Sequence, residues 1–183
     1  MKYFKKIEGK RLYLSPMNME DVSLYCKWLN DSLVTDGINK TEKVTTLENE
    51  RIWLEKSVAD DNYQFVIVLK ENDTPIGSIA INNIDNLNQK ATVGIFIGEI
   101  NNHNKGYGTE ALSLLIGYGF DILNLNNIML AVFSFNEKAI ACYKKVGFKE
   151  IGRRRNCKYI RNIRYDEIFM DIIRDEYYAN KNS

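Results

Sequence analysis

The part of this chain that most constrains its fold runs from residue 94 to residue 148. It opens with an apolar strand, and a glycine-containing loop then leads into an amphipathic helix over residues 108–123. The apolar run Ile128–Phe133 predicts a second strand covered on both faces, and a short helix is predicted over residues 136–147. Two strands, each followed by the N-terminus of a helix, predict a binding place for an anion.

The rest of the chain adds strands and helices around this segment. Strands are predicted over residues 7–14, 63–70, 76–84, 92–97, 148–152 and 165–173, and helices over 18–29 and 46–59. Short turns within residues 63–97 imply an antiparallel meander, so the fold is predicted to be α/β (α+β). The polar residues 31–43 predict a mobile loop. Thr45 and Glu48 match a capping box at the start of the helix predicted over 46–59. The polar tail from Arg174 is predicted to fray.

Composition excludes several classes of protein. The 183 residues contain no linker-like segment and predict one domain, and the net charge of +1 does not favour nucleic acid or an anionic membrane as partner. Three scattered cysteines suit a reducing compartment. With His103 as the sole histidine, neither a metal site nor a Ser-His-Asp triad is expected. No signal peptide or transmembrane run is visible, so we expect a cytoplasmic protein.

The loop before residue 108 is compared with three phosphate-binding motifs. Walker A is excluded because Lys105 precedes the glycines instead of following them. The dinucleotide fingerprint is matched by Gly106, Gly108 and Ala111, but the next strand ends without the acidic residue that would bind the ribose. The third motif is Gln/Arg-x-x-Gly-x-Gly/Ala, in which backbone N–H groups hold a pyrophosphate.

Residues 103–108 match this third motif, except that His103 stands where Gln or Arg is usual. With this loop, the chain resembles the GNAT superfamily of acetyl-CoA-dependent N-acetyltransferases. The resemblance extends to the branch of ribosomal-protein N-terminal acetyltransferases and spermidine acetyltransferases through Thr109-Glu110-Ala111-Leu112, Val132–Asn136, Ala139-Ile140, Tyr143 and Gly147-Phe148. Arg11-Leu12, Glu20-Asp21 and Trp28–Asp31 extend it, less specifically, into the N-terminal half.

The resemblance implies a mixed, mostly antiparallel seven-stranded sheet with helices on both faces. This sheet would be splayed between its fourth and fifth strands, which are Thr92–Ile97 and Ile128–Phe133 here. One acyl-CoA N-acyltransferase domain is expected over residues 1–175, followed by a polar tail over 176–183. Acetyl-CoA would be the co-substrate, bound by Phe96, Ile97, Gly98, His103, Asn104, Lys105, Gly106, Tyr107, Gly108, Thr109 and Asn136.

The chemistry that the resemblance implies needs an acid and a base. Tyr143, two helical turns past Asn136, would protonate the departing thiolate, although helical spacing alone would allow it to be core filler. Glu99, just past the fourth strand, would deprotonate the amine directly or through water, and its alternative is a solvated loop carboxylate. A backbone N–H near Ile97 or Gly98 would stabilise the oxyanion. No metal is expected.

The predicted function is acetyl transfer to a primary amine by direct attack in a ternary complex. The acceptor would be a protein N-terminus, such as that of a ribosomal protein, or a small amine. Polyamines, nucleotide-linked amino sugars and a non-catalytic acyl-CoA-binding role are the alternatives. The acceptor is expected to enter near Thr35–Asn39. We interpret Trp28 and Trp53 as core residues and not as pocket walls. A homodimer is usual in this branch of the family.

Overall fold

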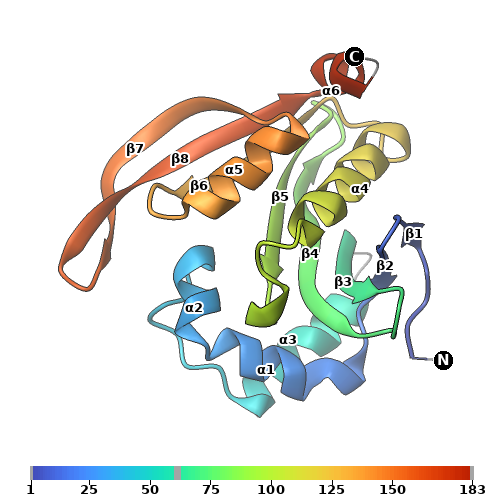
Figure 1. Ribbon diagram of the computed structural model, residues 1–183, viewed down its shortest axis with the longest axis vertical. Helices are drawn as coiled ribbons and strands as arrows, with labels where there is room; N and C mark the ends of the chain where they lie inside the picture. Colours follow the sequence, from blue (N-terminus) through green and yellow to red (C-terminus); the bar gives the residue numbers. More distant parts are fainter. Residues whose placement is uncertain (1, 60–62, 182–183) are drawn as a thin grey trace.

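The protein is described here by a computed structural model covering residues 2–59 and 63–181 (Figure 1). Eight strands form one sheet in the order β1-β2-β3-β4-β5-β6-β8-β7. Their bounds are β1 Ile7–Glu8, β2 Leu12–Pro16, β3 Tyr63–Leu69, β4 Pro75–Asp85, β5 Lys90–Ile97, β6 Asn127–Phe133, β7 Lys149–Ile160 and β8 Ile163–Ile173. Only β5 and β6 are parallel neighbours, which confirms the mixed, mostly antiparallel sheet.

Two strand predictions differ from the structure. The predicted strand 7–14 is a hairpin of two strands, closed by a hydrogen bond from Gly9 N to Leu12 O, so the sheet has eight strands instead of seven. β7 continues to Ile160, well past the predicted end at residue 152. Most of its residues are exposed on both faces, so β7 lacks the apolar alternation that marks a strand in a sequence. Figure 1 shows β7 and β8 projecting from the body as a long arm.

The parallel pair β5–β6 parts soon after it begins. Its register holds only for Lys90–Asn127, Ala91–Ile128 and Thr92–Met129. Beyond Thr92, β5 continues to Ile97 along β4 alone. The predicted splay between these two strands is therefore confirmed, and it leaves one edge of β5 unpaired.

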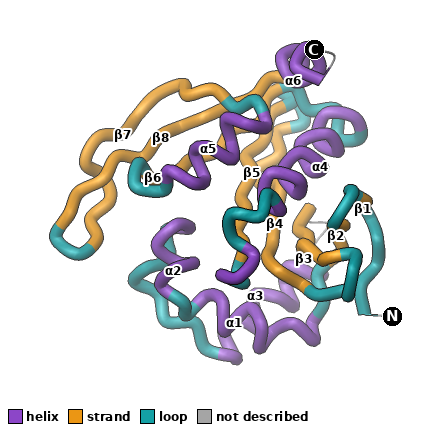
Figure 2. Tube along the Cα trace, in the orientation of Figure 1, coloured by secondary structure: helices purple, strands orange, loops and turns teal. Residues whose placement is uncertain are grey.

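Helices cover both faces of the sheet, as predicted. They are α1 Val22–Leu29, α2 Ser32–Thr35, α3 Leu47–Ala59, α4 Tyr107–Asp121, α5 Glu137–Val146 and α6 Arg174–Lys181. Along β2, Leu12 and Leu14 pack into the larger core beneath α4, whereas Tyr13 packs into a second core with Trp28 of α1. Figure 2 shows α4 and α5 lying next to each other, and α1 and α3 grouped apart from them.

The N-terminal helical region differs from prediction in three details. Residues 31–43 contain α2 and a 3-10 turn over Asp36–Ile38 where a mobile loop was expected. The cap of α3 is Thr46, whose hydroxyl accepts from Asn49 N, and not the expected Thr45. Trp28 is buried as core, but Trp53 is 40% exposed, so the core interpretation of Trp53 is wrong.

The C-terminal residues form α6 where a frayed tail was expected. Tyr177 is buried and its ring contacts that of Phe120, while Arg174 donates to the carbonyl oxygen of Phe120. These contacts explain why a polar segment stays helical, because they fix α6 on α4. The last two residues of the predicted tail lie outside the described residues.

Two glycines inside α4 were expected to be tolerated because the helix packs closely on the sheet. A Cβ at Gly119 would stand 2.9 Å from Ile128 Cδ1 and 3.3 Å from Ile81 Cδ1, and one at Gly117 would stand 3.0 Å from the Tyr177 hydroxyl. Gly119 thus brings α4 close to β4 and β6, whereas Gly117 brings it close to α6. These contacts offset the intrinsic helix cost of about 1 kcal/mol for each glycine.

We predict that Gly119→Ala destabilises the protein by about 1–3 kcal/mol, because the added methyl group overpacks the interface with Ile128. Ser113→Ala, a half-buried position of the same helix, serves as control and should change stability by less than about 0.5 kcal/mol. Urea unfolding followed by circular dichroism measures both. Equal stability of Gly119→Ala and wild type would contradict the packing argument.

Candidate functional site

The loop before α4 has the backbone of an anion site. Asn104 and Gly106 adopt left-handed conformations with φ of 60° and 78°, and Gly106 caps the helix. The N–H groups of Tyr107, Gly108 and Thr109 make no hydrogen bond within the described part of the chain. Since α4 is 15 residues long, its dipole adds positive potential at these free donors. The loop is therefore suited to a phosphate or pyrophosphate.

Gly108 points to a ligand because the protein itself does not require a glycine there. An added Cβ would meet Cys142 Sγ at 3.8 Å and Ile97 Cγ1 at 4.0 Å, which are ordinary contacts. A helical glycine costs about 1 kcal/mol relative to alanine. A ligand lying against this backbone explains the glycine. The same contacts show that the loop, the end of β5 and α5 meet at this point.

Arg11 holds the loop in place, a role that sequence reasoning missed. Its Nε donates to Glu110 Oε2 at 2.8 Å, its backbone N donates to Glu110 Oε1 at 2.8 Å, and its Nη1 donates to Lys105 O at 2.8 Å. The guanidinium also stacks 4.7 Å from the centre of the Tyr107 ring. Burial raises the pKa of Glu110, but hydrogen bonds and charge from Arg11 outweigh it and lower the pKa.

The unpaired edge of β5 presents the backbone of Ile97. Gly98 N donates to Ile76 O at 2.8 Å. In an antiparallel pair every second residue is hydrogen-bonded to the neighbouring strand, so Phe96 bonds Ser78. The N–H and C=O groups of Ile97, which lies between Phe96 and Gly98, therefore point away from β4. Ile97 N–H therefore faces the splay. Of the predicted trio, Ile97 alone offers its backbone there, and Gly98 N–H is engaged and unsuited as an oxyanion donor.

His103 joins the loop to the same strand. Its Nε2 lies 2.8 Å from Ile97 O, within hydrogen-bonding distance. His103, which stands where Gln or Arg is usual, thus contacts the end of β5 through its ring. The backbone N–H groups of the loop stay available to a ligand. Ile97 O is accordingly engaged, while Ile97 N–H stays open.

Helix α5 has the predicted caps and carries two predicted site residues. Asn136 Oδ1 accepts from Ala139 N at 3.2 Å, and Gly147, with φ of 113°, ends the helix. Tyr143 is 8% exposed, its ring contacts that of Phe148, and burial raises the pKa of its hydroxyl. The phenol is protonated at neutral pH, the state that donating a proton requires, although the raised pKa makes it a weaker acid than an exposed tyrosine.

Cys142 lies beside Tyr143 but is no candidate nucleophile. Its Sγ lies 3.2 Å from Thr109 Oγ1, which links α5 to the start of α4. Burial raises the pKa of this thiol, so little thiolate is present at neutral pH. The Thr109 hydroxyl thus contacts α5, and the backbone N–H of Thr109 is free for a ligand within the described residues.

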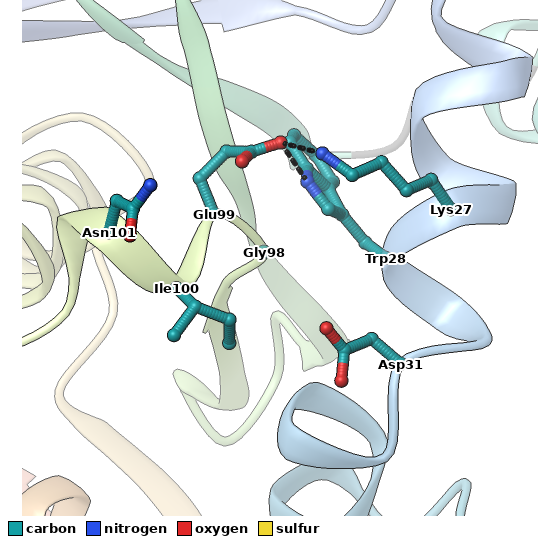
Figure 3. Close-up of a pocket in the computed structure, with 7 residues that line it drawn as sticks. All are labelled: Lys27, Trp28, Asp31, Gly98, Glu99, Ile100 and Asn101. Atoms are coloured by element: carbon teal, nitrogen blue, oxygen red, sulfur yellow. Dashed lines mark hydrogen bonds and ion pairs between the residues drawn. The ribbon is translucent and has the colours of Figure 1, made fainter.

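Glu99 lies in a small cavity between α1 and the turn after β5, shown in Figure 3. Its Oε1 accepts hydrogen bonds from Lys27 Nζ at 2.8 Å and from Trp28 Nε1 at 2.9 Å. These two bonds lower the pKa of the carboxyl group. Lys27, which sequence reasoning did not single out, thus keeps Glu99 ionised. The lowered pKa makes Glu99 a weaker base for direct proton abstraction than an unpaired glutamate.

The expected acceptor entrance is bridged by the β7–β8 arm. Arg161 Nη1 pairs with Asp36 Oδ2 at 2.8 Å, and Lys158 Nζ donates to Asn39 Oδ1 at 2.7 Å. A second cleft of about 320 Å³ lies beside this bridge, lined by Ser32, Leu33, Asp36, Gly37, Phe135, Asn136, Glu137 and Lys138. Asn136 therefore faces this cleft while its side-chain oxygen caps α5.

Comparison with known proteins decides which family has this arrangement. Residues 11–149 match the model of the acetyltransferase (GNAT) domain. The chain belongs to the GNAT acetyltransferase family. It is an N-acetyltransferase, and GNAT enzymes use acetyl-CoA. Within residues 2–59 and 63–181, no helix is long and apolar enough to cross a membrane, and no three potential metal ligands cluster.

Relatives of this GNAT chain differ in what they act on. The uncharacterized N-acetyltransferase p20 of Bacillus licheniformis is 31% identical over 92% of this chain and 96% of that protein. The putative ribosomal N-acetyltransferase YdaF of Bacillus subtilis is 31% identical over 57% of each chain. The spermidine N-acetyltransferase of Vibrio cholerae, solved with CoA and spermine, has a TM-score of 0.83 at 23% identity, covering 93% of this chain and 99% of that one.

We predict that Gly108→Ala weakens CoA binding at least tenfold while leaving the protein as stable as wild type or up to about 1 kcal/mol more stable. The methyl group fits the protein but occupies the ligand's place against the backbone. Calorimetric titration with CoA and thermal unfolding measure the two effects. Gly152→Ala, whose Cβ would meet nothing within 4 Å, is the matched control and should bind CoA normally. Normal CoA binding by Gly108→Ala would contradict this assignment.

A second prediction concerns pH. Arg11 lowers the pKa of Glu110 in the folded protein. The stability that the ionised Glu110 contributes is therefore present above 4.5, the pKa of this group in the unfolded chain, and is lost as the pH falls below that value. The difference in unfolding free energy between wild type and Glu110→Gln should therefore be constant above about pH 5.5 and shrink in acid. Denaturant titrations from pH 3 to 7 measure it, and a difference independent of pH would contradict the role of Arg11.

Proposed function

We propose that the protein transfers the acetyl group of acetyl-CoA to a primary amine by direct attack in a ternary complex. The observation that carries this proposal is that the α4 loop, with its free N–H donors, lies against the unpaired edge of β5, where Ile97 N–H faces away from β4. Tyr143 follows Cys142, which contacts Thr109 at the start of α4. The pyrophosphate would lie on the loop from His103 to Thr109, and the pantetheine arm would lie along Ile97.

The reaction needs no covalent enzyme intermediate. The neutral amine attacks the thioester carbonyl carbon, a C–N bond forms, and the C–S bond breaks. Ile97 N–H stabilises the oxyanion, the departing thiolate takes the proton of Tyr143, and a proton from water then restores the phenol. The ammonium proton leaves through water held by Glu99. The raised pKa of Cys142 fits direct transfer, since an acyl-enzyme would need a thiolate.

The acceptor is a protein N-terminus or a small amine. An α-amino group loses its proton near pH 7.7–8.0, whereas a lysine-like amine does so near 10.4, so the former needs less help from the site. A weak base such as Glu99, held by Lys27, favours the easier proton transfer. An acceptor of the α-amino type is therefore preferred over a polyamine or an amino sugar.

The test of this function is release of CoA from acetyl-CoA in the presence of a peptide with a free N-terminus, with the acetylated product identified by mass spectrometry. Acetylation of the peptide amine supports the proposal. Tight CoA binding without transfer to a peptide N-terminus, a polyamine or an amino sugar would instead indicate a non-catalytic acyl-CoA-binding protein.

We predict that Tyr143→Phe lowers kcat by about 10²–10⁴-fold and changes the KM for acetyl-CoA little, because it removes only the proton for the thiolate. Tyr118→Phe, at another aromatic position where the rings of Tyr63 and Phe65 are the neighbours, is the control and should retain wild-type kcat. Steady-state assays with saturating amine decide the outcome. Full turnover by Tyr143→Phe would exclude it as the acid.

A further inference from the structure

The cavity that contains Glu99 lies directly beyond the open edge of β5. It has a volume of about 130 Å³ and is lined by Lys27, Trp28, Asp31, Gly98, Glu99, Ile100 and Asn101. Gly98 and Glu99 follow Ile97 in the chain, so a group in this cavity stands next to the backbone at which acetyl transfer is proposed. A cavity of this size accepts the end of a side chain or of an alkylamine.

Glu99 is fixed by a clamp and cannot turn freely. Lys27 and Trp28 both bind the same oxygen, Oε1, and Oε2 makes no hydrogen bond within residues 2–59 and 63–181. Trp28 can lie this close only because residue 98 is glycine, where a Cβ would stand 2.2 Å from the indole ring. Tyr25 and Phe96 hold the indole edge-on from two sides. The clamp thus leaves one carboxylate oxygen for a ligand.

The charges around the cavity do not cancel. Lys27 compensates Glu99 through the 2.8 Å ion pair, while Asp31 has no ion pair within the described residues. Asp31 Oδ1 accepts from Leu33 N, and Figure 3 shows the Asp31 carboxylate directed toward the cavity from the opposite side. Two carboxylates and one ammonium leave a single negative charge, which is the complement of one cation.

We propose that Lys27 is a specificity-determining residue that restricts the acceptor to an amine carrying one positive charge. The inference rests on the proposed function and narrows its substrate class. A monocationic amine, such as a peptide α-amino group, is held between Asp31 and Glu99 Oε2. A second ammonium on the acceptor would be repelled by Lys27, which is fixed beside Glu99. Polyamines are therefore disfavoured by charge and not by shape.

The experiment compares two probes with the same carbon chain, n-butylamine and 1,4-diaminobutane, which carry one and two charges at neutral pH. Wild type, Lys27→Met and Lys27→Arg are assayed with saturating acetyl-CoA. Lys27→Met should raise the ratio of kcat/KM for the diamine to kcat/KM for the monoamine about fivefold, as expected for losing one charge at an exposed site. Lys27→Arg keeps the charge and should keep the wild-type ratio.

Two outcomes overturn this inference while leaving acetyl transfer itself intact. One is a ratio that changes less than about twofold in Lys27→Met, and the other is an equal change in Lys27→Arg. Asp31→Asn keeps the acceptor oxygen for Leu33 but removes the net charge, so KM should rise for both probes with little change in kcat. If no variant acetylates either probe, the proposed function fails. The ratio of the dissociation constants of the two probes for the CoA complex, measured by calorimetry, then tests the role of Lys27 separately.

Discussion

The early parting of β5 and β6 is the constraint on which the rest of the site depends. A parallel pair that kept its register would bury the backbone of Ile97 against β6 and leave no place for an extended ligand. Because the register ends after Thr92, one edge of β5 has no strand beside it within the described residues. An unpaired edge in a sheet core is costly unless another chain-like group completes it. A pantetheine arm, which carries amide groups, is such a group.

Keeping that edge open requires fixed elements on each side of it. Arg11 ties the start of β2 to Glu110 and Lys105, so the anion loop is held by the N-terminal end of the chain. His103 ties the loop to Ile97, and Thr109 ties it to α5 through Cys142. Each contact uses a side chain or a carbonyl, and none uses the backbone donors that the ligand needs. The site is thus rigid before a ligand arrives, which limits the entropy lost on binding.

Local signals in the sequence were enough for most strands and for the longer helices, but not for α2 and α6. Asn136 and Gly147 cap α5 through neighbouring residues alone, and both lie where their residue types predicted. The contacts Arg11–Glu110 and Lys27–Glu99 join residues 99 and 72 positions apart, so no local pattern announces them. β7 was underestimated for a related reason, since a strand exposed on both faces has no apolar period to detect.

The environments of Tyr143 and Glu99 drive their pKa values in opposite directions, and this separation assigns their proposed roles. Burial keeps the proton on Tyr143, whereas Lys27 and Trp28 keep it off Glu99. The proton for the thiolate is therefore present before the acceptor binds. The carboxylate opposite attracts the ammonium form but is too weak a base to take its proton, so an acceptor that deprotonates readily in water gains most from this site. Lys27 thus has two effects: it changes the net charge of the cavity, and by lowering the pKa of Glu99 it favours a substrate amine with a low pKa of its own.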